Sequence, residues 1–149
     1  MLLNRVNNRA YLLEKKHAFG RVVISEHSRG IECLVDILAC SAVGAIYTPI
    51  DPQWPEARRK HIKTITNAAA IFTENTSHVT EAKAPLGVTF LERVDDPYNV
   101  PSYCFFTSGS TGEPKGALIA QTGMMNHLHS KVHLLQLGAG SVVAQTAPT

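Results

Sequence analysis

Residues 102–116 read SYCFFTSGSTGEPKG, a strand pattern followed at once by a loop pattern. The aromatic and apolar residues at 102–107 predict a strand. The ten residues from 107 onward hold three glycines, four hydroxyl side chains and one lysine. Glycine lets a backbone approach a ligand closely, and consecutive N–H groups can then surround an anion. This composition indicates phosphate binding, although a plain hairpin connection is almost as consistent with it.

The loop differs from two common nucleotide-binding patterns. A P-loop has four residues between its first glycine and a Gly-Lys pair, and then Ser or Thr. Here only two residues separate Gly112 from Lys115, and Gly116 follows the lysine. The dinucleotide-binding pattern GxGxxG does not occur either. Gly138 and Gly140 match its first two glycines, but Val143 stands where the third glycine is required. The sequence therefore disfavours a dinucleotide-binding oxidoreductase.

Outside this stretch, strand patterns alternate with helical patterns. Short β-branched or aromatic runs predict strands, and apolar residues spaced three and four apart predict helices. We expect strands at 21–25, 45–50, 69–73, 102–107 and 141–146, with a further candidate at 88–92. We expect helices at 2–16, 31–42, 55–65 and 121–137. This alternation is typical of βαβ units, so we predict an α/β fold with a layered parallel sheet.

Composition excludes several classes of protein. The chain has 149 residues, of which 44% are apolar and 17% charged. This fits one domain or one lobe of a larger domain, and not a disordered segment or a membrane bundle. A net charge of +2 is too small to indicate a nucleic-acid partner. The basic residues between 5 and 29 are more typical of a solvated helix face than of an RNA or phosphate patch. The sequence shows neither a secretory signal nor a membrane-spanning run.

The cysteines and histidines give no zinc pattern. Cys33, Cys40 and Cys104 have no CxxC spacing, and their apolar surroundings predict reduced core thiols and a cytoplasmic protein. His129 and His133 lie four residues apart on an expected helix, a spacing that can bind a metal ion. No third ligand is evident, so we interpret them as ordinary surface or packing histidines.

The last part of the sequence is unusually poor in charge. Residues 117–149 contain one charged side chain, Lys131. We expect these elements to be covered by further chain, and an uncovered apolar surface of this kind to associate. The alternative is a buried central strand that happens to come last.

Several segments resemble one known family. The string YCFFTSGSTGEPKG at 103–116 resembles the phosphate-loop signature of the adenylate-forming enzymes, which include acyl-CoA synthetases, luciferases and the adenylation domains of nonribosomal peptide synthetases. LACSAVGAIYTPIDPQWP at 38–55 is similar to the family segment that leads into a Tyr-x-Pro-x-Asp strand exit. The segments 3–13 and 126–137 also resemble the family, the latter most closely the peptide-synthetase adenylation domains. The resemblance implies that 1–149 is a partial N-terminal lobe of such a domain, truncated at its C-terminal end.

The resemblance also implies a reaction and a set of site residues. A carboxylate attacks the α-phosphate of ATP and gives an acyl-adenylate and pyrophosphate. The residues implied to bind the β- and γ-phosphates are Thr107, Ser108, Gly109, Ser110, Thr111, Gly112 and Lys115. Lys115 is implied to be catalytic, because it would neutralise charge on the leaving group. Gln121 departs from the family, since many members have a histidine there.

The implied substrates are ATP and an amino or other carboxylic acid. The implied acceptor is phosphopantetheine on a carrier-protein domain of the full-length enzyme, and the residue that binds Mg²⁺ is expected outside this chain. Because the segments of the acid pocket are also expected elsewhere, the chain alone should be inactive. We expect no nucleic-acid or membrane partner. Two alternatives stay open: a non-catalytic remnant or interaction lobe, and a fragment of an acyl-CoA synthetase.

Overall fold

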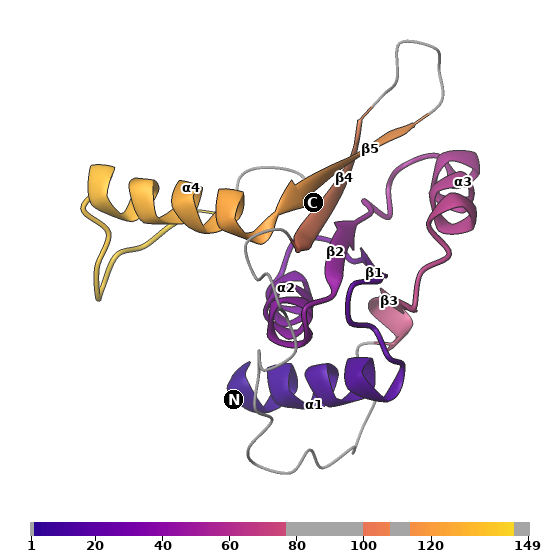
Figure 1. Cartoon of the computed structure of the whole chain (residues 1–149), viewed down its shortest axis with the longest axis horizontal. Coiled ribbons are helices and arrows are strands. Elements are labelled where there is room, and N and C mark those ends of the chain that lie inside the picture. The colour runs from indigo at the N-terminus through magenta and orange to yellow at the C-terminus, as the bar shows by residue number, and fades with distance from the viewer. Residues whose placement is uncertain (1, 77–99, 108–113, 145–149) are drawn as a thin grey trace.

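The computed structural model describes residues 2–76, 100–107 and 114–144 (Figure 1). The helices are α1 (Leu2–Lys15), α2 (Ile31–Val43), α3 (Glu56–Thr66) and α4 (Gln121–Leu134), and a short 3-10 helix covers Glu74–Thr76. The strands are β1 (Val22–Glu26), β2 (Ile46–Pro49), β3 (Ala70–Thr73), β4 (Pro101–Thr107) and β5 (Lys115–Ala120). The strand predicted at 88–92 lies outside the described residues.

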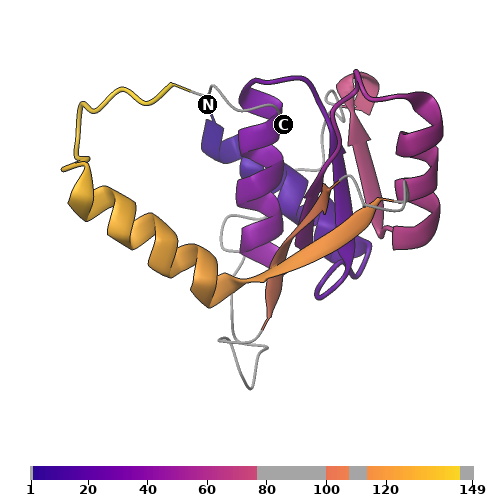
Figure 2. The same cartoon turned by 90° about the horizontal axis from the view of Figure 1, so that it is seen from above.

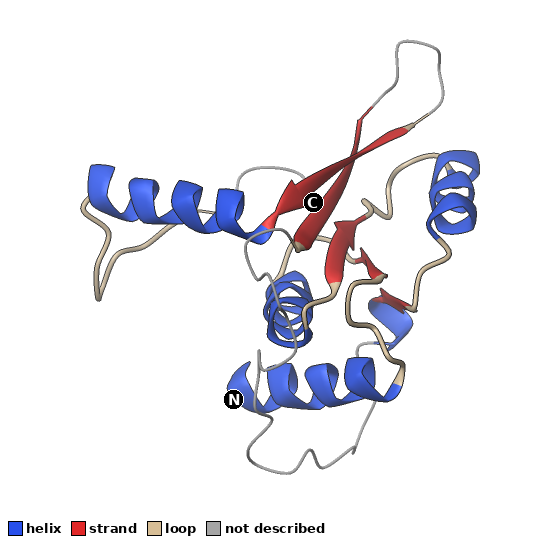
Figure 3. Cartoon of the chain, in the orientation of Figure 1, coloured by secondary structure: helices blue, strands red, loops and turns tan. Residues whose placement is uncertain are grey.

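The strands form one five-stranded sheet in the order β3-β1-β2-β4-β5 (Figure 3). β1 pairs in parallel with β2 and β3, and β4 lies parallel to β2. β5 is antiparallel to β4. The predicted α/β fold is confirmed, but the sheet is mixed and not wholly parallel. Sequence analysis did not predict β5. Its apolar residues 117–120 form a strand because they pair along β4.

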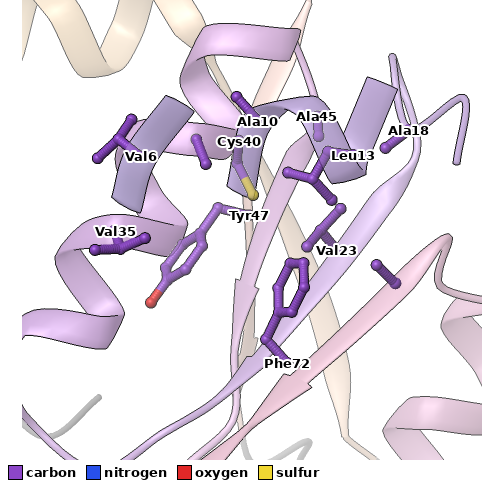
Figure 4. Packing of buried hydrophobic residues seen from close by; sticks show 12 residues of the cluster. Val6, Ala10, Leu13, Ala18, Val23, Val35, Cys40, Ala45, Tyr47 and Phe72 are labelled. Atoms are coloured by element: carbon purple, nitrogen blue, oxygen red, sulfur yellow. The ribbon is translucent and has the colours of Figure 1, made fainter. Parts of the chain in front are cut away.

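Helices cover both faces of the sheet (Figure 2). α1 and α2 pack on one face around the larger core cluster (Figure 4), and α3 packs on the other face over a smaller cluster of isoleucines. Along β1, Val23 belongs to the larger cluster and Ile24 to the smaller one, as the two-residue period of a strand requires. The larger cluster comprises Val6, Ala10, Leu13, Ala18, Val23, Val35, Ala39, Cys40, Ala45, Tyr47, Ala70 and Phe72.

A buried ionic network joins α1, α2 and β1. Asp36 of α2 is fully buried, and Arg9 of α1, which is 5% exposed, donates a hydrogen bond to its Oδ1. Ser25 Oγ donates to Asp36 Oδ2 at 2.7 Å, and His27 Nε2 lies 3.2 Å from the same oxygen. Arg9 also donates to Glu32 Oε2 at 3.1 Å. The Asp36 carboxylate is therefore compensated inside the core, as a buried charge must be.

Gly44 follows the last residue of α2 and caps its C-terminus. Gly44 has φ 68°, and its N–H donates toward the carbonyl oxygens of Cys40 and Ser41. This left-handed conformation suits glycine. A Cβ at this position would also lie 2.8 Å from ring atoms of Phe19. The chain can therefore turn into β2 directly after the helix.

The last predicted elements need correction. α4 ends at Leu134 and not at 137, and residues 141–144 form no strand. α4 leads the chain away from the sheet (Figure 1), so these residues have no neighbouring strand to pair with in the described ranges. Val142 is accordingly 97% exposed. The remainder of the predicted strand, 145–146, lies outside the described residues. None of the described helices is long and apolar enough to cross a membrane.

Candidate phosphate-binding site

The parallel strands β1 to β4 share one edge of the sheet at their carboxyl ends. Open parallel sheets bind ligands at this edge. The glycine-rich loop begins here, after Thr107 at the end of β4, and β5 begins at Lys115. These two residues are opposite each other in the β4–β5 register, and Thr107 Oγ1 donates to the Lys115 carbonyl oxygen at 3.5 Å. The structure thus brings two of the predicted site residues together.

Both Thr107 and Lys115 are exposed, so their side chains are accessible to a ligand. The other predicted site residues lie outside the described residues: Ser108, Gly109, Ser110, Thr111 and Gly112. The strands on either side of residues 108–113, β4 and β5, pair as a hairpin. This agrees with the alternative prediction of a hairpin connection. A hairpin at the ligand-binding edge of the sheet is compatible with phosphate binding, which stays a prediction.

Gly116 shows why a small residue follows the lysine. It pairs with Phe106 across the hairpin. A Cβ on Gly116 would lie 3.1 Å from Cys104 Sγ and 3.2 Å from ring atoms of Phe106, which is tighter than ordinary contact. A larger residue would therefore require the Cys104 and Phe106 side chains to move by a few tenths of an ångström. The glycine allows close packing of β5 on β4 beside Lys115 and Thr107.

An ion-pair cluster joins β1 to α3 at the same edge. Glu26, the last residue of β1, is 5% exposed and pairs with both Arg59 and Lys63 of α3. Burial acts to raise the pKa of the Glu26 carboxyl, but hydrogen bonds from Lys63 and Arg59 outweigh it and lower the pKa from its ordinary 4.5. The ionised carboxylate therefore holds α3 against the sheet through residues of its middle and last turns.

Glu26→Gln is expected to flatten the pH dependence of stability at acid pH. Because its pKa is lower in the folded state, Glu26 stabilises the fold above its unfolded pKa and loses this contribution as pH falls through the folded pKa. Wild type should therefore lose stability below about pH 5, and the variant should lose less over the same range. Urea unfolding across pH measures this, with Glu14→Gln, at an exposed position of α1, as the control. Equal slopes for Glu26→Gln and wild type would contradict the assignment.

Arg58 of α3 reaches the end of β4, a contact that sequence analysis missed. Its Cζ lies 4.0 Å from the centroid of the Trp54 ring, and its Nη2 donates to the Phe106 carbonyl oxygen at 3.3 Å. The available signal was the spacing of Trp54 and Arg58, four residues apart across the start of a helix. The partner at Phe106 is 48 residues away, beyond the reach of local patterns.

The histidine pair predicted on α4 lacks a third metal ligand among the described residues. The rings of His129 and His133 are exposed and touch edge-to-face at 4.7 Å between centroids. No group of three or more His, Cys, Asp or Glu side chains that could hold a metal ion occurs in the ranges the structure describes. The cysteines are buried free thiols, which confirms the predicted core thiols.

Comparison with known proteins identifies the family. Residues 2–149 match the family model described as AMP-binding enzyme. The chain belongs to the AMP-binding enzyme family. It is 31% identical to the hybrid PKS-NRPS synthetase pydA of an Acremonium species over 96% of this chain and 4% of that protein. It is 30% identical to gramicidin S synthase 2 of Aneurinibacillus migulanus over 78% of this chain and 3% of that protein.

A third relative is surfactin synthase subunit 3 of Bacillus subtilis, 31% identical over 85% of this chain and 11% of that protein. The AMP-binding chain thus spans a small part of the curated relatives it matches. The predicted resemblance to peptide-synthetase adenylation domains is confirmed by these matches.

Solved structures show the same fold. Apo MatB from Rhodopseudomonas palustris superimposes with a TM-score of 0.79 at 16% identity, over 99% of this chain and 34% of that chain. The N-terminal subdomain of Klebsiella oxytoca NpsA, in complex with 3-hydroxyanthranilyl-AMSN, gives a TM-score of 0.62 at 21% identity, over 80% of this chain and 32% of that chain. The described part of the AMP-binding chain therefore has the architecture found in the N-terminal portion of such enzymes.

Proposed function

We propose that the chain is part of an ATP-dependent ligase that activates an amino acid or another carboxylic acid as an acyl-adenylate. The observation that carries this proposal is the pairing of Thr107 with Lys115 at the carboxyl edge of the sheet, in a member of the AMP-binding family. Relatives at 30% identity or more are peptide synthetases, which favours this class over an acyl-CoA synthetase. We take residues 1–149 as part of one adenylation domain.

In the proposed reaction, a carboxylate oxygen of the acid attacks the α-phosphorus of ATP. The bond from this phosphorus to the oxygen that bridges to the β-phosphate breaks, and pyrophosphate leaves with the electron pair. Lys115 neutralises the charge that develops on the leaving phosphates, and the Thr107 hydroxyl rotates from the Lys115 carbonyl oxygen to donate to a phosphate oxygen. The backbone N–H groups and hydroxyls of 108–112 complete the proposed anion site.

Mg²⁺ that accompanies ATP is usually held by one or two carboxylates together with phosphate oxygens. We propose that the protein ligand of this ion lies in a part of the protein outside this chain. The chemistry that this chain supplies is binding and charge neutralisation of the phosphates.

The acyl group is then proposed to pass to the phosphopantetheine thiol of a carrier-protein domain, with release of AMP. The residues that bind the acid and the carrier are assigned to chain beyond 149. The isolated chain is accordingly expected to show no amino-acid-dependent exchange between ATP and pyrophosphate, and measurable exchange would contradict this part of the proposal. The buried thiols favour a reducing compartment, so we place the protein in the cytoplasm.

One observation favours a second candidate, a non-catalytic interaction lobe. α4 has no buried residue, and its exposed apolar side chains include Met125, Leu128, Val132 and Leu134. An apolar surface of this kind is typical of a protein–protein contact. Sedimentation velocity distinguishes the two: an interaction lobe should associate with rising concentration and not respond to ATP, whereas a monomer that binds ATP would contradict it.

Thermal unfolding of the 149-residue chain with and without Mg-ATP tests the ligase proposal. A ligand that binds only the folded state raises the Tm, and at 100 times its Kd it adds about 2.7 kcal/mol to the free energy of unfolding. We expect ATP to raise the Tm more than AMP does, because AMP lacks the β- and γ-phosphates that the loop is proposed to bind. A cooperative transition that ATP leaves unchanged, or equal shifts with ATP and AMP, would contradict the proposal.

A further inference from the structure

Arg58 links the start of α3 to the end of β4 by a hydrogen bond. It is partly buried, and its Nη2 donates a hydrogen bond to the carbonyl oxygen of Phe106, the residue directly before Thr107. β2 ends at Pro49, and its register with β4, which places Tyr47 beside Tyr103, carries Phe106 past that end. The guanidinium therefore supports β4 on the side where β2 has ended.

Trp54, on whose ring Arg58 stacks, is itself held in place by neighbouring residues. The backbone N–H of Trp54 donates to the Asp51 carbonyl oxygen at 3.0 Å. Arg59 Nε donates to the Trp54 carbonyl oxygen, also at 3.0 Å. The Trp54 side chain packs with that of Phe106 against the isoleucine cluster beneath α3. Trp54 thus offers a fixed aromatic face beside the end of β4.

A guanidinium is suited to this place in a way that an ammonium is not. It is planar, so it can stack on the Trp54 ring and donate in its own plane to the Phe106 carbonyl at once. Its Nε atom is buried and has no hydrogen-bond partner among the described residues. Arg58 is therefore held by its stacking on the Trp54 ring and by its hydrogen bond to the Phe106 carbonyl oxygen. Neither of these contacts places an acidic side chain against its positive charge.

We propose that Arg58 is a positioning residue for the phosphate site: by holding the Phe106 carbonyl it fixes Thr107, and through the hairpin register Lys115, for contact with phosphate. This inference rests on the proposed binding of ATP phosphates at Thr107 and Lys115. Trp54, the single tryptophan of the sequence, contacts Arg58 directly. Its fluorescence should therefore report the binding of ATP.

The test titrates the 149-residue chain with ATP, by calorimetry for affinity and by tryptophan emission for the Trp54–Arg58 contact. Arg58→Ala is expected to weaken ATP binding about tenfold, which corresponds to about 1.4 kcal/mol. It should also abolish the change in tryptophan emission that we expect of wild type at saturating ATP. Arg58→Lys is expected to weaken binding to a similar extent, because lysine keeps the charge but not the planar stack.

Arg21→Ala is the matched control. Arg21 is exposed and precedes β1, at the opposite edge of the sheet, so its loss removes the same charge without touching β4. We expect its ATP affinity and emission change to stay within about twofold of wild type. A merely structural role for Arg58 would lower the Tm of Arg58→Ala but leave the emission change at saturating ATP in place, and would overturn the inference.

The outcomes separate this inference from the proposed function. If wild type binds ATP and Arg58→Ala or Arg58→Lys binds it equally well, Arg58 is not a positioning residue, while the proposed function stands. If wild type unfolds cooperatively and yet binds no ATP, the proposed function and this inference both fail. Should Arg58→Ala not fold, Arg58→Lys, which retains the charge and the alkyl stem, decides the matter.

Discussion

Asp36→Ala is expected to lower the free energy of unfolding by about 3 kcal/mol or more. The Asp36 carboxylate is fully buried and accepts hydrogen bonds from Arg9 and Ser25. Its removal leaves Arg9, which is also buried, without the countercharge that lies deepest in the core. Losing one partner of a buried ion pair costs more than the pair contributes as a whole, because the remaining charge stays out of water.

Urea unfolding of wild type and Asp36→Ala measures this loss. Glu14→Ala, at an exposed position of the same helix as Arg9, should change stability by no more than about 0.5 kcal/mol. The double variant Arg9→Met, Asp36→Leu should recover part of the stability lost in Asp36→Ala, since it leaves no unpaired charge. A loss below about 1 kcal/mol for Asp36→Ala, the value of an average substitution, would show that the network does not hold α1 and α2 to the sheet.

Lys115→Ala is expected to weaken ATP binding between about tenfold and a hundredfold, with little effect on stability. Hydrogen bonds to charged groups contribute about 1.5–3 kcal/mol, which corresponds to that range of Kd. Lys115 is exposed at the first position of β5, so its side chain is not part of the core. Loss of affinity without loss of stability is the pattern that distinguishes a ligand contact from a structural one.

Calorimetric titration with Mg-ATP provides the measurement for Lys115→Ala. Lys131→Ala is the matched control, because Lys131 is an exposed lysine in the last turn of α4, on an element that extends away from the hairpin (Figure 1). Its Kd should equal that of wild type within about twofold. Equal affinities for the two lysine variants would remove Lys115 from the site.

The sequence predicts the βαβ part of the fold closely, because each of its elements has a strong local pattern. The strand expected at 21–25 is found at Val22–Glu26, and the helix expected at 31–42 is found at Ile31–Val43. Gly44 ends that helix by a conformation that few other residues adopt readily. These elements could be predicted since the signals lie within a few residues of each other.

The features that sequence analysis missed depend on partners far along the chain. β5 exists because Lys115–Ala120 pairs with β4, and four apolar residues alone do not show this. The Arg9–Asp36 bond joins residues 27 apart. The strand expected at 141–146 failed in its described part for the same reason: Val142 and Val143 have the right composition, but no strand among the described residues lies beside them.

Around the candidate site, the structure bears out the predicted strand end, whereas phosphate binding there stays a prediction. The glycine-rich composition of 107–116 and the preceding strand pattern indicated an anion site at a strand end, and the structure places that strand end at the carboxyl edge of the sheet. The supporting contacts of Glu26 and Arg58 were not predicted. Their importance comes from where α3 packs, which periodicity does not specify.

A titration of the ¹⁵N-labelled chain with Mg-ATP, followed by amide chemical shifts, tests the central claim most directly. The claim is that phosphates bind between the paired ends of β4 and β5. We expect shift changes concentrated at residues 107–116, reproduced by inorganic tripolyphosphate and lost in Lys115→Ala. A response centred on α1 and α2, or the absence of any response from a folded chain, would contradict the claim.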